Sequence, residues 1–336
     1  MKIVPVPIGD IQVEKSGEPR KTPAFLSLSL VASAWLANEI ALAWIHERVP
    51  RDSPPLPDLW FSIFPEDGDG RNPDRLLKIE KDGLGVNHSI VYNAATKLRI
   101  ASFGAFSSAM VTGAIRITEA IMLTIIVSAV IVIVCHQHRW IVTRRVFFCV
   151  ALCYTFRAIC ITIFQVPVPS VQTYCAPKTD GSLQVIVKRV LKIAWSAGIE
   201  ELRARELCGD LIISGHTISL FNAVFAFKQY APRKLNLLAH LYSVAAVVAV
   251  VCILLARKHY TIDVVLGYLV SSRTFWTYHS LQNSYHNDKM EKNALSQSCW
   301  SWVVPYFEKD APPPHLFLNR LVWPSSCPQR IRRRWA

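Results

Sequence analysis

Two short stretches of this chain combine residues that do acid-base and nucleophilic chemistry. The first, CGDLIISGHT, ends on His216, and the second, HYTID, carries His259 with Asp263 four residues later. An imidazole can attack phosphorus to give a phosphohistidine, and a carboxylate can hold the other ring nitrogen and favour one tautomer. A second imidazole can protonate the departing alkoxide. These three residues are therefore the candidate catalytic group of a two-step phosphoryl transfer.

Neighbouring residues are candidates for substrate binding. Ser214, Gly215 and Thr217 offer hydroxyl and backbone donors to phosphate oxygens, which stabilises transition-state charge without a metal or cofactor. Two further candidates, Asp210 and Tyr260, lie beside the histidines in the same motifs. Simpler interpretations remain open: each histidine could be an interfacial polar residue, and Asp263 could cap a helix.

One more candidate, Arg157, lies inside an apolar run. It either contacts a substrate phosphate or pairs structurally with Glu119 or Glu39.

Composition indicates a membrane protein. Hydrophobic residues make up 51% of the 336 residues and charged residues only 18%. The net charge of +13 is scattered between apolar runs, which favours anionic lipid surfaces over nucleic acid. No Cys-x-x-Cys pair supports a zinc site. Among the nine cysteines, only Cys175 and Cys208 look able to form a disulfide.

We expect an all-α fold, a polytopic bundle of six transmembrane helices, that positions the two motifs. The apolar runs that predict these helices are Phe25–Ile45, Ile117–Cys135, Val146–Val166, Leu211–Phe227, Leu237–Ala256 and Val264–Leu281. The chain then divides into an amino-terminal tail (1–24), a catalytic domain (25–285) and a carboxyl-terminal tail (286–336). An insert of about 50 residues, 66–113, is expected to be a loop, although an extra membrane segment near 101–115 stays open.

Basic residues predict the orientation of the bundle. The loops HQHRWIVTRR and KQYAPRKLN and both chain ends are basic, so both termini are expected on the cytoplasmic side. His216, His259 and Asp263 then meet on the exoplasmic or lumenal face, although neither motif was required to lie at that end of its helix. Asn87 begins the only Asn-x-Ser/Thr sequon and is expected on that same face.

CGDLIISGHT and HYTIDVVLGY resemble the active-site motifs of the sphingomyelin synthase family, which is itself similar to the lipid phosphate phosphatases. The segments HERVP, PPLPD, RAICITIFQVPVPS, CAPK, RTFWTYH and VPYFEKD fit the same family. The resemblance implies an integral membrane enzyme of the Golgi or plasma membrane that moves phosphocholine from phosphatidylcholine to ceramide, giving sphingomyelin and diacylglycerol. It implies that His259 is the nucleophile, Asp263 its orienting partner and His216 the acid and then the base. An oligomer is compatible with the sequence.

The chain departs from the family pattern in two places. Leu211, Ile212 and Ile213 stand where aromatic residues are usual, so the choice between choline and ethanolamine head groups is open, and the insert at 66–113 is unusual. Two other function classes remain as alternatives. A lipid phosphate phosphatase would use the same residues with water as acceptor, and a lipid-binding or transport protein would not need His259 at all.

Overall fold

The computed structural model describes residues 20–50, 53–63, 113–170, 175–179, 183–195 and 207–322. The predictions that concern Asn87, the body of the insert and the two chain ends fall outside these residues. Within the described residues the fold is all-α, with no strand and only isolated bridge residues such as His136, which pairs with Leu321. The predicted fold class is confirmed.

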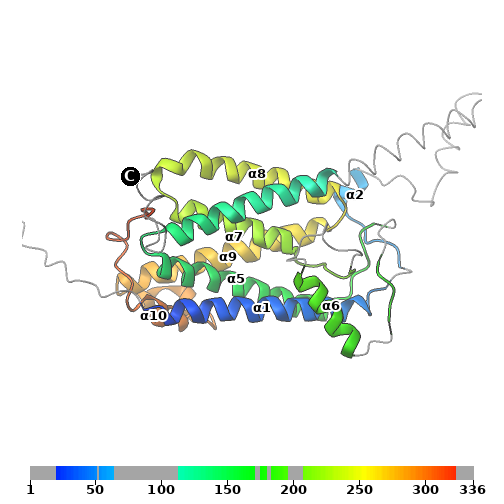
Figure 1. Ribbon diagram of the computed structural model, residues 1–336, viewed down its shortest axis with the longest axis horizontal. Helices are drawn as coiled ribbons and strands as arrows, with labels where there is room; N and C mark the ends of the chain where they lie inside the picture. The colour runs from blue at the N-terminus through cyan, green and yellow to red at the C-terminus, as the bar shows by residue number, and fades with distance from the viewer. Residues whose placement is uncertain are drawn as a thin grey trace, which may run out of the picture.

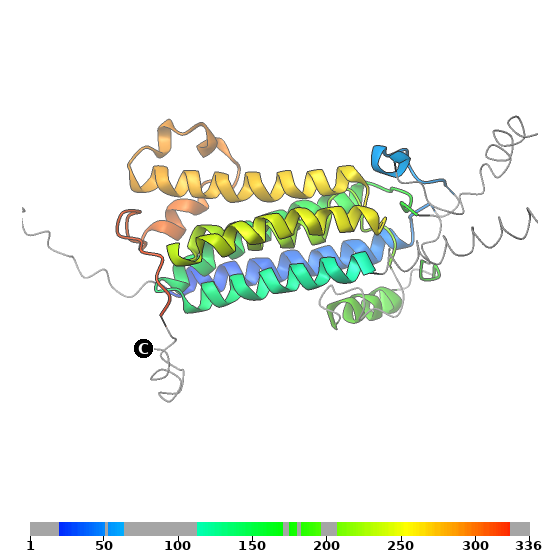
Figure 2. The same cartoon turned by 90° about the horizontal axis from the view of Figure 1, so that it is seen from above.

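Six long helices lie side by side and form an elongated bundle (Figures 1 and 2). They are α1 (Thr22–His46), the helix Gly113–Cys135, α5 (Arg139–Ile163), α7 (Gly215–Tyr230), α8 (Asn236–Leu255) and α9 (Thr261–His286). Four segments are long and apolar enough to cross a membrane: α1, Gly113–Cys135, α5 and Arg233–Leu255, which contains α8. The other two long helices differ, because α7 has only 16 residues and α9 is richer in polar residues.

The outer surface of the bundle is apolar, as a hydrocarbon environment requires. Along α8, the side chains of Leu237, Leu241, Val244 and Val247 are all more than half exposed. A water-soluble bundle would bury such a stripe. The chain is therefore an integral membrane protein.

The predicted start of the fourth helix is wrong. Residues 211–214 are not helical, and α7 begins at Gly215. Ile212 adopts the left-handed conformation, with φ of 77°, and Ser214 is extended and caps α7 by accepting a hydrogen bond from the Thr217 amide. Leu211–Ile213 are apolar and largely buried, although they lie in a loop. Hydropathy reports only the apolar character, so it could not distinguish these residues from the first turn of a helix.

Several other helix boundaries also differ from the predicted ones; for example, α5 ends at Ile163 and not at Val166, and α7 continues past Phe227 to Tyr230. α5 begins at Arg139, seven residues before Val146, because Arg144 and Arg145 are buried by partners from the carboxyl-terminal segment. α9 continues past Leu281 to His286.

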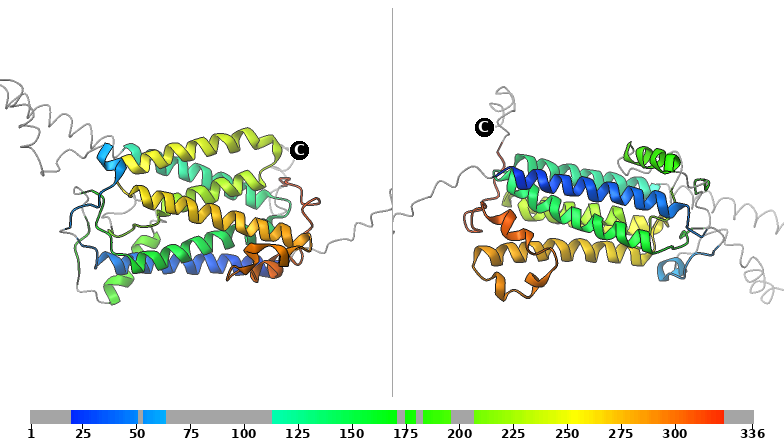
Figure 3. Two further views of the ribbon diagram at one scale, coloured as in Figure 1. Left: turned by 180° about the vertical axis from the view of Figure 1, so that it is seen from behind. Right: turned by 90° about the horizontal axis from the view of Figure 1, so that it is seen from below.

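The two ends of the bundle differ. The end that carries the first residues of α7 and α9, called here the site end, also carries the short helices α2 (Leu59–Ile63) and α6 (Leu183–Trp195) (Figures 1 and 3). The opposite end, called the far end, is covered by α10 (Val303–Glu308) and the chain around it. Glu308 is fully buried there and bonds Arg145 of α5 and Tyr278 of α9.

Candidate active site

The two motifs meet at the site end because α7 and α9 begin beside each other. The amide of Ser214, the N-cap of α7, donates to the carbonyl of Asp263 at 3.1 Å. The rings of His216 and His259 lie 6.1 Å apart between centroids and are tilted by 66°. The structure thus brings together the two histidines and the aspartate that the sequence nominated.

Asp263 is fully buried, and its carboxylate accepts two backbone hydrogen bonds and faces His259. One carboxylate oxygen, Oδ1, accepts from the Ile212 amide at 2.9 Å, and Oδ2 accepts from the Tyr260 amide at 2.9 Å. His259 Nδ1 lies 3.5 Å from Oδ2. Asp263 is therefore both a helix cap, as the simpler interpretation held, and the group that faces His259.

Asp263 lies on the Nδ1 side of the His259 ring. Nδ1 is within ion-pair distance of Oδ2 but makes no hydrogen bond to any described residue. A carboxylate on this side suits the tautomer with its proton on Nδ1, which leaves the lone pair on Nε2. His259 is only 3% exposed, so the arrangement is shielded from bulk water. A buried carboxylate also stabilises the positive imidazole that forms during nucleophilic attack at phosphorus.

Arg157 of α5 fixes the loop that carries the first motif. Its Nε donates to the carbonyl of Ile213 at 2.9 Å, and its two terminal nitrogens bond Asp210 and Asn38 of α1. Gly215 makes this packing possible, because a Cβ there would lie 3.0 Å from Arg157 Nη2. The pairing of Arg157 with Asp210 was not predicted.

The comparisons with known proteins agree with this geometry. The family described as "PAP2 superfamily C-terminal" matches residues 207–280, which include both motifs. Sphingomyelin synthase-related 2 of Caenorhabditis elegans is 51% identical over 306 residues, which cover 90% of this chain and 80% of that protein. This chain belongs to the sphingomyelin synthase family.

More distant relatives carry a name that states an activity. Phosphatidylcholine:ceramide cholinephosphotransferase 1 of Homo sapiens is 27% identical over 311 residues, covering 91% of this chain but 64% of the human protein. Phosphatidylcholine:ceramide cholinephosphotransferase 2 of Mus musculus is 29% identical over 300 residues, covering 87% of this chain and 69% of that protein. These relatives of the sphingomyelin synthase family are named as transferases.

Three nominated binding residues also have structural contacts in this family member, although the buried Thr217 hydroxyl has no hydrogen-bond partner among the described residues. The Tyr260 hydroxyl donates to the Pro167 carbonyl and accepts from the Leu56 amide, both at 3.0 Å. Ser214 is fully buried as the N-cap of α7, and Thr217 packs against Gly267, where a Cβ would lie 3.0 Å from Thr217 Cβ. Their contact with substrate stays a prediction.

Sequence reasoning missed two residues that hold the site from other elements. Asp58, in the PPLPD segment, accepts from the Thr261 amide at 2.9 Å and from the Thr261 hydroxyl at 2.8 Å, which fixes the start of α9. His46, at the end of α1, accepts from the Cys208 amide at 2.9 Å. The predicted Cys175–Cys208 disulfide is confirmed and lies beside that amide. The signal for both residues was their place in family segments, because His46 begins HERVP and Asp58 ends PPLPD.

Proposed function

We propose that this protein transfers phosphocholine from phosphatidylcholine to ceramide through a phosphohistidine on His259. The observation that carries the proposal is the placement of Asp263, which faces His259 Nδ1 and also binds the loop before His216. The names of the relatives support the substrates, and the geometry supports the two-step route.

In the first step, Nε2 of His259 attacks phosphorus, and the bond from phosphorus to the diacylglycerol oxygen breaks. His216, as imidazolium, gives its proton to that oxygen, so diacylglycerol leaves as an alcohol. In the second step, neutral His216 takes the proton of the ceramide primary hydroxyl. The resulting oxygen attacks phosphorus, and the bond from phosphorus to His259 breaks. Both histidines return to their starting states.

The start of α7 suits the phosphate in both steps. Gly215 is the first residue of α7, and the positive end of a helix favours an anion such as a phosphate. Arg157 is already paired with Asp210, so its role here is to hold the loop in place. Phosphate binding by these groups is part of the proposal.

The orientation is likewise proposed. Basic loops favour a cytoplasmic far end, which puts the site end on the lumenal face of the Golgi or the outer face of the plasma membrane. The confirmed disulfide at the site end supports an oxidising compartment there. The division into residues 1–24, 25–285 and 286–336 fits this orientation.

The test is head-group transfer to fluorescent ceramide by microsomes that contain the protein, with phosphatidylcholine or phosphatidylethanolamine as donor. We expect sphingomyelin from the wild type and at least a roughly thousandfold loss in His259→Ala, because the nucleophile is gone. His240→Ala, at an exposed histidine of α8, is the matched control and should retain activity.

The other outcomes are informative. Ceramide phosphoethanolamine in place of sphingomyelin would contradict the choline assignment and leave the mechanism intact. Release of free phosphocholine or phosphate without transfer would make water the acceptor and this protein a phosphatase. Activity of His259→Ala equal to the wild type would contradict the nucleophile.

A further inference from the structure

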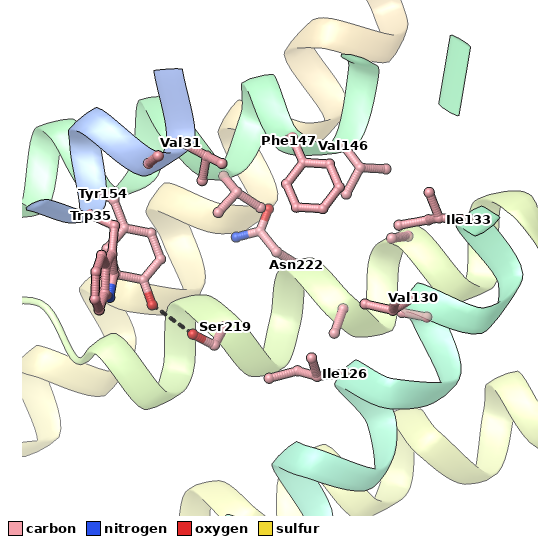
Figure 4. A pocket seen from close by; sticks show the side chains of 15 residues that line it. Val31, Trp35, Ile126, Val130, Ile133, Val146, Phe147, Tyr154, Ser219 and Asn222 are labelled. Carbon is pink, nitrogen blue, oxygen red and sulfur yellow. Dashed lines mark hydrogen bonds between the residues drawn. The ribbon is translucent and has the colours of Figure 1, made fainter. Parts of the chain in front are cut away.

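An apolar cavity of about 360 Å³ lies between α1, the helix Gly113–Cys135, α5 and α7. Most of its lining is aliphatic or aromatic, including Val31, Trp35, Val130 and Phe147 (Figure 4). Three polar side chains interrupt this lining: Tyr154, Ser219 and Asn222. Polar groups within a hydrocarbon environment are costly unless they have partners. Tyr154 and Ser219 bond each other, so Asn222 is the residue that indicates a ligand.

The three polar side chains lie on helices that also carry residues of the candidate site. Ser219 follows His216 by three residues on α7, almost one turn, and Asn222 follows Ser219 by three more. Tyr154 lies one turn from Arg157 on α5, and its hydroxyl bonds the Ser219 hydroxyl at 2.7 Å. The polar part of the cavity therefore lies within about two helical turns of His216 along α7.

Asn222 presents an acceptor that lacks a partner. Its amide nitrogen, Nδ2, donates to the Ile218 carbonyl at 2.9 Å, which determines which way the amide faces. Its oxygen, Oδ1, is buried and has no hydrogen-bond partner among the described residues, and the whole residue is 2% exposed. One of the two hydroxyl protons of Tyr154 and Ser219 forms the hydrogen bond between them. The other proton remains available to donate to a ligand. The cavity is therefore complementary to a lipid that places a hydrogen-bond donor beside Asn222.

The donors of the two lipids decide which of them suits this acceptor. Beside its reacting primary hydroxyl, ceramide has two further donors, a secondary hydroxyl on carbon three and an amide N–H. Diacylglycerol has one free hydroxyl and otherwise only ester oxygens, which accept and cannot donate.

We propose that this cavity binds the sphingoid part of the acceptor and that Asn222, with Tyr154 and Ser219, selects ceramide over diacylglycerol. This inference rests on the proposed function. It also explains how the reaction avoids returning the head group to the diacylglycerol that the first step releases. The diacylglycerol released in the first step carries a primary hydroxyl that can take the head group back. A site that hydrogen-bonds the ceramide secondary hydroxyl disfavours this return.

The test compares two acceptors, ceramide and 3-deoxyceramide, which lacks the secondary hydroxyl, and also measures return of the head group to labelled diacylglycerol. We expect kcat/KM of the wild type to be about tenfold higher for ceramide than for 3-deoxyceramide. Asn222→Leu keeps the side-chain shape and removes the acceptor, so its kcat/KM for ceramide should fall about tenfold. Its rates with 3-deoxyceramide and diacylglycerol should stay within about twofold. Equal losses with all three acceptors would overturn the proposal.

Two further variants separate selection from general packing. Ser219→Ala, at a half-buried position, should also reduce the preference for ceramide. Val150→Ala is the matched control because Val150 lines the same cavity without a polar atom. It should weaken all acceptors alike and leave the ratio between ceramide and 3-deoxyceramide unchanged. A ratio that Val150→Ala lowers as much as Asn222→Leu does would contradict the role of Asn222.

A binding measurement distinguishes failure of this inference from failure of the proposed function. If the folded wild type transfers to no acceptor, the proposed function fails. The inference is then decided by thermal stabilisation of His259→Ala protein in mixed micelles of ceramide or 3-deoxyceramide. Stronger stabilisation by ceramide that is lost in the double variant His259→Ala, Asn222→Leu supports it. Equal stabilisation by the two lipids overturns it.

Discussion

Gly215 shows how one missing side chain sets the geometry of the site. The guanidinium of Arg157 lies directly against its Cα, holds the Ile213 carbonyl and pairs with Asp210. A glycine before the catalytic candidate His216 was first interpreted as a source of backbone donors for phosphate. The structure adds a steric reason for it.

We predict that Gly215→Ala lowers transfer activity by roughly tenfold or more, because the new methyl group moves Arg157 and the loop before His216. Overpacking of this kind also costs about 1–3 kcal/mol of stability. Transfer rate and melting temperature of purified protein measure the two effects. Gly113→Ala is the control, since a Cβ at Gly113 meets nothing within 4 Å. Equal effects of the two substitutions would show that helix propensity, and not the contact with Arg157, is responsible.

At the scale of elements, the loop that enters α7 is held by α1. The Cys175–Cys208 disulfide joins two segments, and His46 contacts both, accepting from the Cys208 amide and lying 3.1 Å from the Ala176 carbonyl through Nε2. Next to it, Glu47 bonds Thr179 and pairs with Arg189 of α6. Burial alone would raise the pKa of Glu47, but these hydrogen bonds and the Arg189 charge lower it. The end of α1 thus anchors both α6 and the loop before the site.

We predict that Cys208→Ser destabilises the protein by about 2–5 kcal/mol and lowers transfer, because Asp210 lies two residues from the lost bridge. The melting temperature and the transfer rate in detergent should both fall, and added reductant should have no further effect on the variant. Cys299→Ser removes an exposed free thiol and serves as the control. If Cys208→Ser melts and reacts like Cys299→Ser, the disulfide does not support the site.

At the scale of the whole molecule, the far end is closed by the carboxyl-terminal segment. Glu308 bonds Arg145 and Tyr278 and lies 3.2 Å from His286, so a charge from the last described element is buried between α5 and α9. The Arg145 charge outweighs the effect of burial and lowers the pKa of Glu308 below its usual range. His136, in the turn before α5, packs against this segment through Phe317 and Asn319.

We predict an acid-sensitive far end. Burial lowers the pKa of His136 to about 4, assisted by the His138 and Arg145 charges and opposed by the Asn319 hydrogen bond. The unfolded residue titrates near 6.5. The stability that neutral His136 contributes is thus present above pH 6.5 and is lost as pH falls toward 4, by at most about 1.4 kcal/mol per pH unit.

The measurement is the melting temperature between pH 7.5 and 4.5 for the wild type and His136→Gln. The variant should show a shallower decline below pH 6.5, with the remainder coming from groups such as His138, whose pKa burial also lowers. Parallel curves for the two proteins would show that His136 does not contribute to the acid sensitivity.

The sequence by itself determined the class of the protein and nominated the residues of its candidate site. Apolar runs of membrane length predicted the six long helices, because hydropathy is a local property of the chain. The residue types in CGDLIISGHT and HYTID predicted the two histidines and Asp263, since their chemistry does not depend on the fold. The Cys175–Cys208 pair was also predictable, because the other cysteines considered lay in or beside apolar runs.

Only the tertiary structure decided how distant segments complete the site. The links from Arg157 to Asp210, from His46 to Cys208 and from Asp58 to Thr261 join residues between 53 and 203 positions apart, so no local pattern reveals them. The left-handed Ile212 and the start of α7 at Gly215 follow from these contacts and not from hydropathy. The cavity with Asn222 also depends on four helices at once, and its partnerless oxygen becomes visible only when those helices are packed.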